Sequence, residues 1–491
     1  MDGQASYENG LSSSFPQEPA SERMPLLANH RLDSTNGKAN SNWVRDARLL
    51  ARNSVPLIVA GLLQHSLSIT NIFAVGHLGE IELAAVSLSI MSANITGYAV
   101  YQGMATALDT LCAQAYGSGR HHLVGLYFQQ MVIFLWLLTI PIGIIWLNAD
   151  KILGVMVPDK RTADLAGVYM KILFLGAPGY ASFEAGKRFV QSQGIFHAAT
   201  HILLVLAPLN ALLNWFLVWK LELGFIGAPI SIAITNNLLP FCLFLYVYFI
   251  DGRKCWGGFT TKVFQNWSIM IKLAFPGFLM LEAEFLAFEV LTLAASYLST
   301  TQLAAESIVG PLIALTFQAP FALAIAASTQ IANLIGGGAP NQAKQCATIA
   351  AYGACLIGAL NFVLMIRLGG SAAGWLTSDE SVVEQVIEVV PIIATFQLFD
   401  SLAITFNGIL RSLGKQSVGG LISVFCYYII AMPISFMTAF WLRWELFGLW
   451  TGIAVALGLN SLIGGYYIYS TSWDAAVEAA RERNMKASIR S

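Results

Sequence analysis

Long apolar stretches separated by short polar ones cover most of the chain after residue 41. Each stretch is about 20 residues or longer, which is the length that an α-helix needs to cross the hydrocarbon of a bilayer. The alternating segments of a transmembrane β-barrel are shorter, about 10 residues each, and do not fit this pattern. The pattern predicts an all-α polytopic membrane protein with twelve transmembrane helices, at approximately residues 54–75, 83–106, 123–147, 165–186, 197–219, 226–250, 269–297, 303–327, 345–368, 386–409, 418–441 and 447–470.

The segments that flank these helices are polar. Residues 1–41 are rich in Ser, Asn, Pro and Gly and lack apolar periodicity, which is typical of disorder. From Ser41 to Ser54, basic and apolar residues alternate at helical spacing, which predicts a short interfacial helix before the first span. The expected organisation is a disordered cytosolic tail at 1–41, an N-terminal six-helix lobe at 42–250 that begins with the interfacial helix, a cytosolic loop at 251–268, a C-terminal six-helix lobe at 269–471 and a cytosolic tail at 472–491.

The composition agrees with a membrane protein and narrows its function. Of the 491 residues, 56% are hydrophobic and 11% are charged, whereas soluble domains carry about 25% charged residues. The net charge of −1 argues against a nucleic-acid partner. With both termini cytosolic, about twenty Lys and Arg residues, including Lys187 and Arg188, lie in cytosolic segments and six lie outside, as the positive-inside rule requires. No His-rich box, Ser/Lys pair or metal-ligand spacing occurs, so we expect neither an enzyme nor a cofactor or metal.

The chain also contains an internal repeat. RNSVPLIVAG, which begins at Arg52, aligns with KLAFPGFLML, which begins at Lys272, and QAYGSG at Gln114 aligns with NLIGGG at Asn333. The same offset of about 220 residues relates Gly194 to Gly414 and Gly227 to Gly448. Each half holds six spans, an even number, so both halves enter the membrane in the same direction. Two parallel halves around a site near the midplane are typical of transporters.

Carboxylates lie deep in two of the predicted spans. FLMLEAEFLAFEVLTLAASYL, which begins at Phe278, is almost wholly apolar but contains Glu282, Glu284 and Glu289, and Asp400 lies similarly deep in the tenth span. A charged residue at the bilayer centre costs about 2.5–3.5 kcal/mol or more, so such residues face protein or water and tend to be functional. Burial disfavours the charged form of a carboxylate, so such a group can accept a proton on one side and release it on the other.

Helix geometry separates the three glutamates of the seventh span. Glu282 and Glu289, seven positions apart, share a helix face, and Glu284 points away from both. We interpret Glu284 as the site for the proton and for a cationic substrate, and Glu289 as a second candidate. The alternative for each carboxylate is a structural hydrogen bond between helices.

Other residues are candidates for contacts with substrate or for the gates. Aromatic faces suit a cationic substrate and a His can relay protons, although packing is the more ordinary role for both. The residues of this kind that fall in the predicted spans are Tyr98, Tyr101, Phe288, Phe317, Phe396 and His65. Asp109, Gln114 and Tyr116 lie at the inner end of the second span, and we interpret them as gating or structural residues.

Four motifs resemble the eukaryotic MATE family, the multidrug and toxic compound extrusion transporters. They are VGHLGEIELAAVSL (Val75 to Leu88), ALDTLCAQAYGSG (Ala107 to Gly119), CWGGF (Cys255 to Phe259) and GILRSLGKQ (Gly408 to Gln416), and the resemblance covers roughly residues 45–475. The resemblance implies a V-shaped pair of six-helix lobes that exports organic cations and other amphiphiles against an inward proton or sodium gradient.

The resemblance also assigns roles to particular residues. Glu284 and Glu289 match the E-x-x-x-x-E pair in the seventh span of animal members, and Asp400 matches the acidic residue of their tenth span. Two positions depart from the family pattern. Asn71 stands where many bacterial members have an Asp, which disfavours a sodium or proton site in the first lobe, and Pro311 stands where animal members have a Glu.

We therefore expect a proton-coupled antiporter that exports organic compounds by alternating access. The alternatives are a sodium-coupled exporter and a flippase for lipid-linked substrates of the same superfamily. The expected partners are small organic, often cationic, substrates and membrane lipids, and the protein is expected to be a monomer. ERMPLL resembles an acidic dileucine sorting signal through Glu22, Leu26 and Leu27, which favours a vacuolar or endosomal membrane and adaptor proteins over the plasma membrane.

Overall fold

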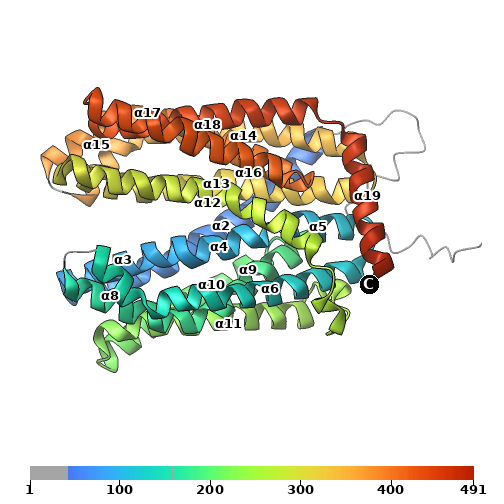
Figure 1. Ribbon diagram of the computed structural model, residues 1–491, viewed down its shortest axis with the longest axis horizontal. Coiled ribbons are helices and arrows are strands. Elements are labelled where there is room, and N and C mark those ends of the chain that lie inside the picture. The colour runs from blue at the N-terminus through green and yellow to red at the C-terminus, as the bar shows by residue number, and fades with distance from the viewer. Residues whose placement is uncertain (1–42, 157–158, 378, 491) are drawn as a thin grey trace, which may run out of the picture. The chain divides into compact units, whose positions relative to one another are not determined.

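The computed structural model describes residues 43–156, 159–377 and 379–490, and these residues are organised as helices joined by short connections (Figure 1). Glu22, Leu26 and Leu27 of the expected sorting signal lie outside the described residues.

The first lobe extends from α2 to α11. Its elements are α2 (Trp43–Gly76); α3 (Glu80–Ala93), η2 (Asn94–Tyr98), α4 (Ala99–Ala105) and α5 (Ala107–Gly117), which follow one another as the second long segment; α6 (His121–Leu147); the short α7 (Ala149–Met156); α8 (Lys160–Leu173), η3 (Phe174–Gly176) and α9 (Ala177–Ser192); α10 (Ala198–Asn214) with η4 (Trp215–Lys220); and η5 (Gly224–Ile226) with α11 (Gly227–Phe249). The stretch expected as a separate interfacial helix, residues 41–54, is from Trp43 onward the beginning of the single helix α2.

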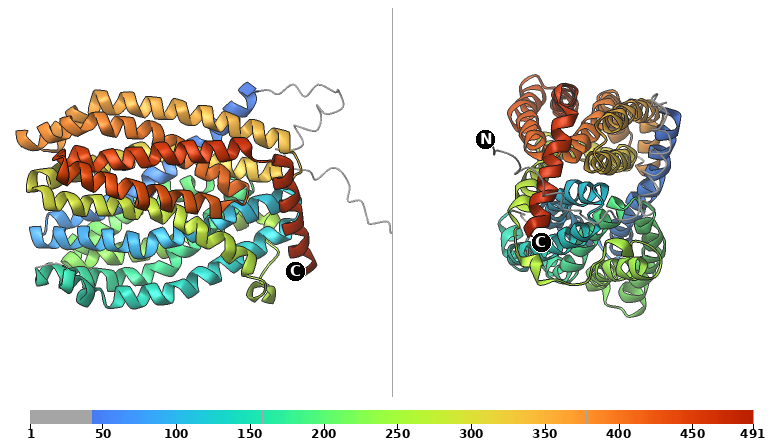
Figure 2. Two further views of the ribbon diagram at one scale, coloured as in Figure 1. Left: turned by 45° about the horizontal axis from the view of Figure 1, so that its top comes forward. Right: turned by 90° about the vertical axis from the view of Figure 1, so that its right-hand side faces the viewer.

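The second lobe extends from α12 to α18. The connection to it contains η6 (Arg253–Cys255) and η7 (Thr261–Phe264). The elements of the lobe are α12 (Ser268–Leu298), α13 (Thr300–Gly336), α14 (Pro340–Leu376), α15 (Glu380–Ser412), α16 (Gln416–Val424), η8 (Phe425–Ala431), α17 (Met432–Phe436), η9 (Met437–Trp441) and α18 (Glu445–Ser470). The residues expected as a tail from 472 fold as α19 (Trp473–Arg490), which packs on α13 and α14 of this lobe and on α5 of the first (Figure 2).

Ten helices within the described residues are long and apolar enough to cross a membrane. The other two expected spans, 165–186 and 269–297, fold as α8–α9 and α12. These two segments carry the ionisable side chains that lower their hydropathy, among them Glu184 and Lys187 in α9 and Glu284 in α12. Lys187 and its neighbour Arg188, expected in a cytosolic connection, lie inside α9, which continues to Ser192.

The backbone repeats the duplication seen in the sequence. Positive φ angles occur at the matched glycines that end corresponding helices: 79° at Gly119 and 75° at Gly338, and 82° at Gly194 and 74° at Gly414. Left-handed backbone at a helix end favours glycine because other residues suffer a Cβ clash there. The duplication has therefore kept the same turns in both lobes.

A second matched pair, Gly227 and Gly448, lets two backbones approach closely. A Cβ on Gly227 would lie 2.8 Å from the carbonyl carbon of Leu217, and one on Gly448 would lie 2.6 Å from the amide nitrogen of Ala439. Real Cβ atoms do not approach other atoms so closely, so only glycine fits at both positions. The repeat has therefore kept the same close backbone approach in both lobes.

Contacts between the lobes involve the inner helices of each. In the first lobe α4 and η2 contact α12 of the second, α9 contacts α13, and α5 contacts α12, α13 and α15. In Figure 1, α5 lies beside α13, close to α19. This arrangement places the ends of α5, α9, α13 and α15 around a common region.

Candidate functional site

The second lobe buries a carboxylate cluster, which we define as Glu284 of α12, Asp400 of α15 and Tyr427 of η8. Glu284 is 4% exposed, Asp400 is 1% exposed and Tyr427 is 1% exposed. The three groups interact electrostatically with one another. Neither carboxylate has a cation within 4.0 Å among the described residues, and Oδ2 of Asp400 has no hydrogen-bond partner there. The structure thus brings together the two carboxylates singled out from the sequence.

The remaining glutamates of α12 lie on a different face of the helix. Glu282 and Glu289, seven residues apart, share one face of α12, and Glu282 acts electrostatically on Tyr428 of η8 in the same lobe. Both are half-buried, and Oε2 of Glu282 has no hydrogen-bond partner among the described residues.

A fifth carboxylate of the second lobe, Glu306, has a structural partner. It is 5% exposed and accepts a hydrogen bond from Nε1 of Trp450 at 2.9 Å. Trp450 also packs on Phe288 and Phe396, at ring distances of 5.8 and 5.5 Å. A buried indole N–H needs an acceptor, which Glu306 supplies.

Most of the aromatic residues proposed for substrate contact have a packing role. Phe396 is 1% exposed in the hydrophobic core, and Tyr101 is fully buried with its hydroxyl donating to Oγ1 of Thr139 at 2.9 Å. These two residues do not line a surface that substrate can reach in this conformation, and Phe288 packs against the same core as Phe396. The other candidates, Tyr98, His65 and Phe317, are half-buried, as is Phe288. The ring of Tyr98 lies 4.3 Å from that of Tyr180, and Phe317 stacks on Phe321 at 5.3 Å.

The lobes are joined by an ion-pair triad, Asp109 of α5 with Arg188 of α9 and Arg411 of α15. Its Oδ1 lies 3.4 Å from Nε of Arg188, and its Oδ2 lies 3.6 Å from Nε of Arg411. All three side chains are at most 5% exposed. Removing one partner of a buried pair leaves an uncompensated charge, so loss of Asp109 would destabilise the arrangement in which the lobes meet.

Hydrogen bonds with approximate twofold symmetry surround this triad. Nε2 of Gln114 donates to the carbonyl oxygen of Ser412 at 2.8 Å, and Nδ2 of Asn333 donates to that of Ser192 at 3.2 Å. Gln114 matches Asn333 in the repeat, and Ser192 matches Ser412. Each bond therefore runs from one lobe to the corresponding carbonyl of the other.

Two matched glycines make these bonds geometrically feasible. A Cβ on Gly117 would collide with the backbone of Asn333, and one on Gly336 would collide with the backbone of Gln114. We call the ion-pair triad, these hydrogen bonds and this crossing the inter-lobe seal. Asp109 and Gln114 thus belong to the seal, whereas Tyr116 packs on the ring of His121 at 5.1 Å.

The terminal helix α19 also contacts the seal. Nη2 of Arg483 donates to Oε1 of Gln114 at 2.8 Å, and Nδ2 of Asn484 donates to the carbonyl oxygen of Gln114 and to Oγ of Ser118, both at 3.2 Å. Burial lowers the pKa of Arg483. These bonds give partners to the side-chain oxygen and the backbone carbonyl of Gln114, which the hydrogen bond to Ser412 does not use.

The first lobe contains a polar cluster that the sequence analysis missed. We call Gln64 of α2 together with Tyr180, Glu184 and Lys187 of α9 the N-lobe cluster. Nζ of Lys187 lies 2.7 Å from Oε1 of Glu184 and 3.0 Å from Oε1 of Gln64. Nε2 of Gln64 donates to Oε1 of Glu184 at 3.2 Å and to the hydroxyl of Tyr180 at 3.4 Å.

The offset of the repeat was the signal that could have found this cluster. Adding 220 to Gln64 gives Glu284, and adding 220 to Tyr180 gives Asp400. The two clusters therefore occupy corresponding positions, although no side-chain type is shared between the matched residues.

Asn71, where many bacterial relatives of this architecture have an Asp, is a hydrogen-bonding group within the first lobe. It is fully buried, its Nδ2 donates to the hydroxyl of Tyr169 at 3.4 Å, and its Oδ1 accepts from Ser231 at 3.3 Å. Within the described residues, no three His, Cys, Asp or Glu side chains are grouped so that they could hold a metal ion.

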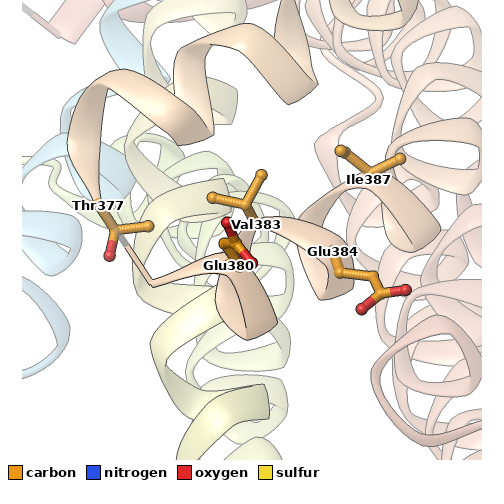
Figure 3. A pocket seen from close by; sticks show the side chains of 5 residues that line it. All are labelled: Thr377, Glu380, Val383, Glu384 and Ile387. Carbon is orange, nitrogen blue, oxygen red and sulfur yellow. The ribbon is translucent and has the colours of Figure 1, made fainter.

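A pocket lies well away from both clusters along the chain, where α14 connects to α15. Figure 3 shows its lining, which consists of Thr377, Glu380, Val383, Glu384 and Ile387. Its volume is about 330 Å³. Glu380, Glu384 and Ile387 are exposed, so the pocket is a surface feature of this connection and contains none of the residues proposed for the site.

Comparison with known proteins places this geometry in a family. A family model described as MatE matches residues 56–216 and again residues 276–437, so the two matches begin about 220 residues apart. The chain belongs to the MATE family. The double match confirms both the resemblance drawn from the motifs and the internal repeat.

Individual MATE proteins are similar over nearly the whole chain. An uncharacterised transporter of Saccharomyces cerevisiae is 39% identical over 87% of this chain, which spans only 62% of that protein. Multidrug and toxin extrusion protein 2 of Mus musculus is 32% identical, with 97% of this chain and 83% of the mouse protein covered. The crystal structure of the eukaryotic MATE transporter AtDTX14 is 26% identical and has a TM-score of 0.86. The match covers 90% of this chain and 99% of that structure's chain. The MATE fold of twelve transmembrane helices in two lobes is confirmed.

Proposed function

We propose that this MATE transporter is a proton-coupled antiporter that exports small organic compounds, organic cations among them, by alternating access. The observation that carries the proposal is the pair of buried carboxylates, Glu284 and Asp400, with no cation in ion-pair contact among the described residues. Two carboxylates that interact inside a protein cannot both ionise readily, so they share a proton. A shared proton on a mobile transporter can be carried from one side of the membrane to the other.

The seal supplies a way to release that proton on one side. Arg411 is held by Asp109 of the opposite lobe, yet it also acts electrostatically on Glu284. When the lobes separate at the seal, Asp109 moves with the first lobe and Arg411 stays with the second. The freed guanidinium then stabilises the ionised form of the Glu284–Asp400 pair, which favours proton release toward the side on which the seal has opened.

Glu289 and Glu282 are the less buried carboxylates of α12. Both are half-buried, whereas Glu284 and Asp400 are buried, so a cationic substrate would reach them before the buried pair. Glu289 stays a candidate for the cation, as the sequence suggested, and Glu282, which shares its helix face, is added to the same role. Competition between cation and proton for these carboxylates would couple the two movements.

Two alternatives use different ions or substrates. Sodium coupling is disfavoured because Asn71, where many bacterial members carry an Asp, is a neutral group hydrogen-bonded to Tyr169 and Ser231. A flippase for lipid-linked substrates would need a wide, strongly basic cavity, and the basic side chains around the seal are paired with Asp109 and Glu184.

Vesicle transport tests the proposal directly. The full-length protein is reconstituted, a proton gradient is imposed, and uptake of a fluorescent organic cation is measured for wild type, Glu284→Gln and Asp400→Asn. Glu306→Gln is the matched control, because Glu306 is equally buried but bonded to Trp450. We expect gradient-driven uptake, insensitive to sodium, that both cluster variants abolish and the control retains. Uptake in Glu284→Gln equal to that of wild type, or dependence on a sodium gradient, would contradict proton coupling through this pair.

We also propose a vacuolar or endosomal membrane with both termini cytosolic, reached through adaptor recognition of Glu22, Leu26 and Leu27. Export from the cytosol would then concentrate compounds in an acidic lumen. A fluorescent fusion of the full chain in which Leu26 and Leu27 are replaced by Ala should move to the plasma membrane. Unchanged localisation would remove the signal from the proposal.

A further inference from the structure

The N-lobe cluster is a set of ordered polar groups, as a ligand-binding site requires. It contains a cation, the ammonium of Lys187, whereas the carboxylate cluster contains none. Nζ of Lys187 contacts Oε1 of Glu184 and Oε1 of Gln64, which use two of its three N–H donors. The hydroxyl of Tyr180 accepts from Nε2 of Gln102 at 2.9 Å as well as from Gln64. The ring of Phe183 lies 5.4 Å below the ammonium. The ammonium is therefore held by three contacts, and the hydroxyl of Tyr180 is held by two hydrogen bonds of its own.

The ammonium of Lys187 is the charge of this region that a ligand can reach. Three ion pairs link Lys187 to Glu184, and Arg188 and Arg411 to Asp109, so three cations face two carboxylates. The side chain of Lys187 is 15% exposed, whereas those of the other four are between 1% and 5% exposed. The surplus positive charge lies in the ion-pair triad, where Arg188 and Arg411 share Asp109, and Lys187, one residue before Arg188, supplies the accessible ammonium.

The N-lobe cluster also lies on the side of the first lobe that meets the second. Gly61 of α2 is so close to Gln318 of α13 that a Cβ there would collide with its side-chain oxygen. Gln64 is three residues beyond Gly61 and so lies on the same helix face, one turn away. Gln102 of α4 is next to Gly103, which contacts Phe278 of α12. An organic compound held between the lobes would therefore meet Gln64, with the ammonium of Lys187 beside it.

We propose that Lys187, with Gln64 and Tyr180, forms a substrate subsite that binds the carboxylate group of anionic or zwitterionic organic compounds. The inference rests on the proposed export function and names a substrate class for it. The third N–H of the ammonium donates to the incoming carboxylate, and the amide of Gln64 and the hydroxyl of Tyr180 complete the polar wall. The duplication has thus given the transporter a cation-seeking site in one lobe and an anion-seeking site at the matching position of the other.

Equilibrium binding to the purified full-length protein in detergent, without any gradient, tests the subsite. The probes are a fluorescent compound with one tertiary amine and one carboxylate, and its methyl ester, which keeps the amine but not the negative charge. The main variant is Lys187→Met with Glu184→Gln, which removes both charges of the buried pair and leaves no unpaired carboxylate. Lys187→Arg keeps the positive charge. Lys171→Met is the matched control, because Lys171 pairs with Asp150 at 3.0 Å in the same lobe outside the N-lobe cluster.

We expect the double variant to weaken binding of the acid by about tenfold, the size of a lost hydrogen bond to a charged group, and to leave the ester within about twofold. Lys187→Arg should retain the preference for the acid, and Lys171→Met should bind both probes like wild type. Equal affinity of wild type for acid and ester, or equal losses of both in the double variant, would overturn the subsite.

These outcomes are separable from a failure of the proposed function. Binding that distinguishes the acid in a Lys187-dependent way, together with uptake that ignores a proton gradient, would refute proton coupling and support the subsite. Gradient-driven uptake of an organic cation, together with no Lys187-dependent preference, would support the function and refute the subsite.

Discussion

The two lobes of this transporter share a backbone plan and differ in how they treat buried charge. In the first lobe, Glu184 is paired with Lys187 and Asp109 with Arg188. In the second, Glu284 and Asp400 are buried without an ion-pair partner among the described residues. Matched turns and matched close approaches of glycine leave the geometry alike, so the difference lies in side chains at corresponding positions. A duplicated fold can therefore keep its mechanics while each copy acquires its own chemistry.

The inter-lobe seal connects the paired charges of the first lobe with the buried carboxylates of the second. Asp109 of the first lobe neutralises Arg411 of the second, and Arg411 in turn acts on Glu284. The hydrogen bonds of Gln114 and Asn333 are matched between lobes, whereas the ion-pair triad is not. The symmetric part of the seal fits the closure of two equivalent halves, and in the proposed function the asymmetric part links closure to proton affinity through Arg411 and Glu284.

Breaking the asymmetric part should have the largest effect. Asp109→Ala leaves Arg188 and Arg411 buried without a carboxylate, and loss of one partner of a buried pair costs about 3–5 kcal/mol. We expect a large fall in the thermal unfolding midpoint of the purified protein in detergent. The control is Glu82→Ala, which removes a partly exposed pair with Arg161 at 3.9 Å and should change stability by about 1 kcal/mol or less. A midpoint equal to that of wild type in Asp109→Ala would show that the triad does not hold the lobes together.

Substitutions in the symmetric part should have smaller effects that are equal in the two lobes. Gly117→Ala and Gly336→Ala each place a Cβ against the facing backbone of the other lobe, and overpacking of this kind costs about 1–3 kcal/mol. Each variant should expose a cysteine introduced at Ser412 to a membrane-impermeant thiol reagent more than the parent does. Gly154→Ala, at a glycine with open space beside it, is the control. Opening in one variant and not in the other would contradict the twofold character of the seal.

The sequence predicted some features of this molecule and could not predict others, for physical reasons. Glu284 and Asp400 of the carboxylate cluster stood out because charge in a long apolar stretch is costly, and the repeat stood out because glycines and prolines recur where the backbone requires them. Lys187 was placed in a connection because a buried Lys–Glu pair lowers hydropathy just as a loop does. Tyr101 and Phe396 were proposed for substrate contact because the rotation of a helix about its axis, which decides what a side chain faces, depends on tertiary packing.

The smallest expected effect concerns two matched helix caps outside the membrane. Asp159 caps α8 and Asp379 caps α15, 220 positions apart, and each carboxylate accepts hydrogen bonds at the start of its helix. The side-chain bond from Thr162 lowers the pKa of Asp159, and that from Ser381 lowers the pKa of Asp379. A folded-state pKa below the unfolded value stabilises the protein above about pH 4, and the contribution is lost as the pH falls through the folded-state pKa.

Asp159→Ala and Asp379→Ala should therefore each lower the unfolding midpoint slightly at pH 7, by similar amounts in the two lobes, because each removes an N-cap. The deficit relative to wild type should shrink as the pH is lowered below about 4, where the wild-type carboxylates become protonated. Asp159→Asn and Asp379→Asn keep a capping oxygen without the charge, so their midpoints should fall less at pH 7. A deficit that does not change with pH in the Ala variants would show that the carboxylate charge contributes nothing to the caps. A deficit in only one lobe would show that the matched caps do not contribute equally. The equivalence of the two lobes would then hold only inside the membrane.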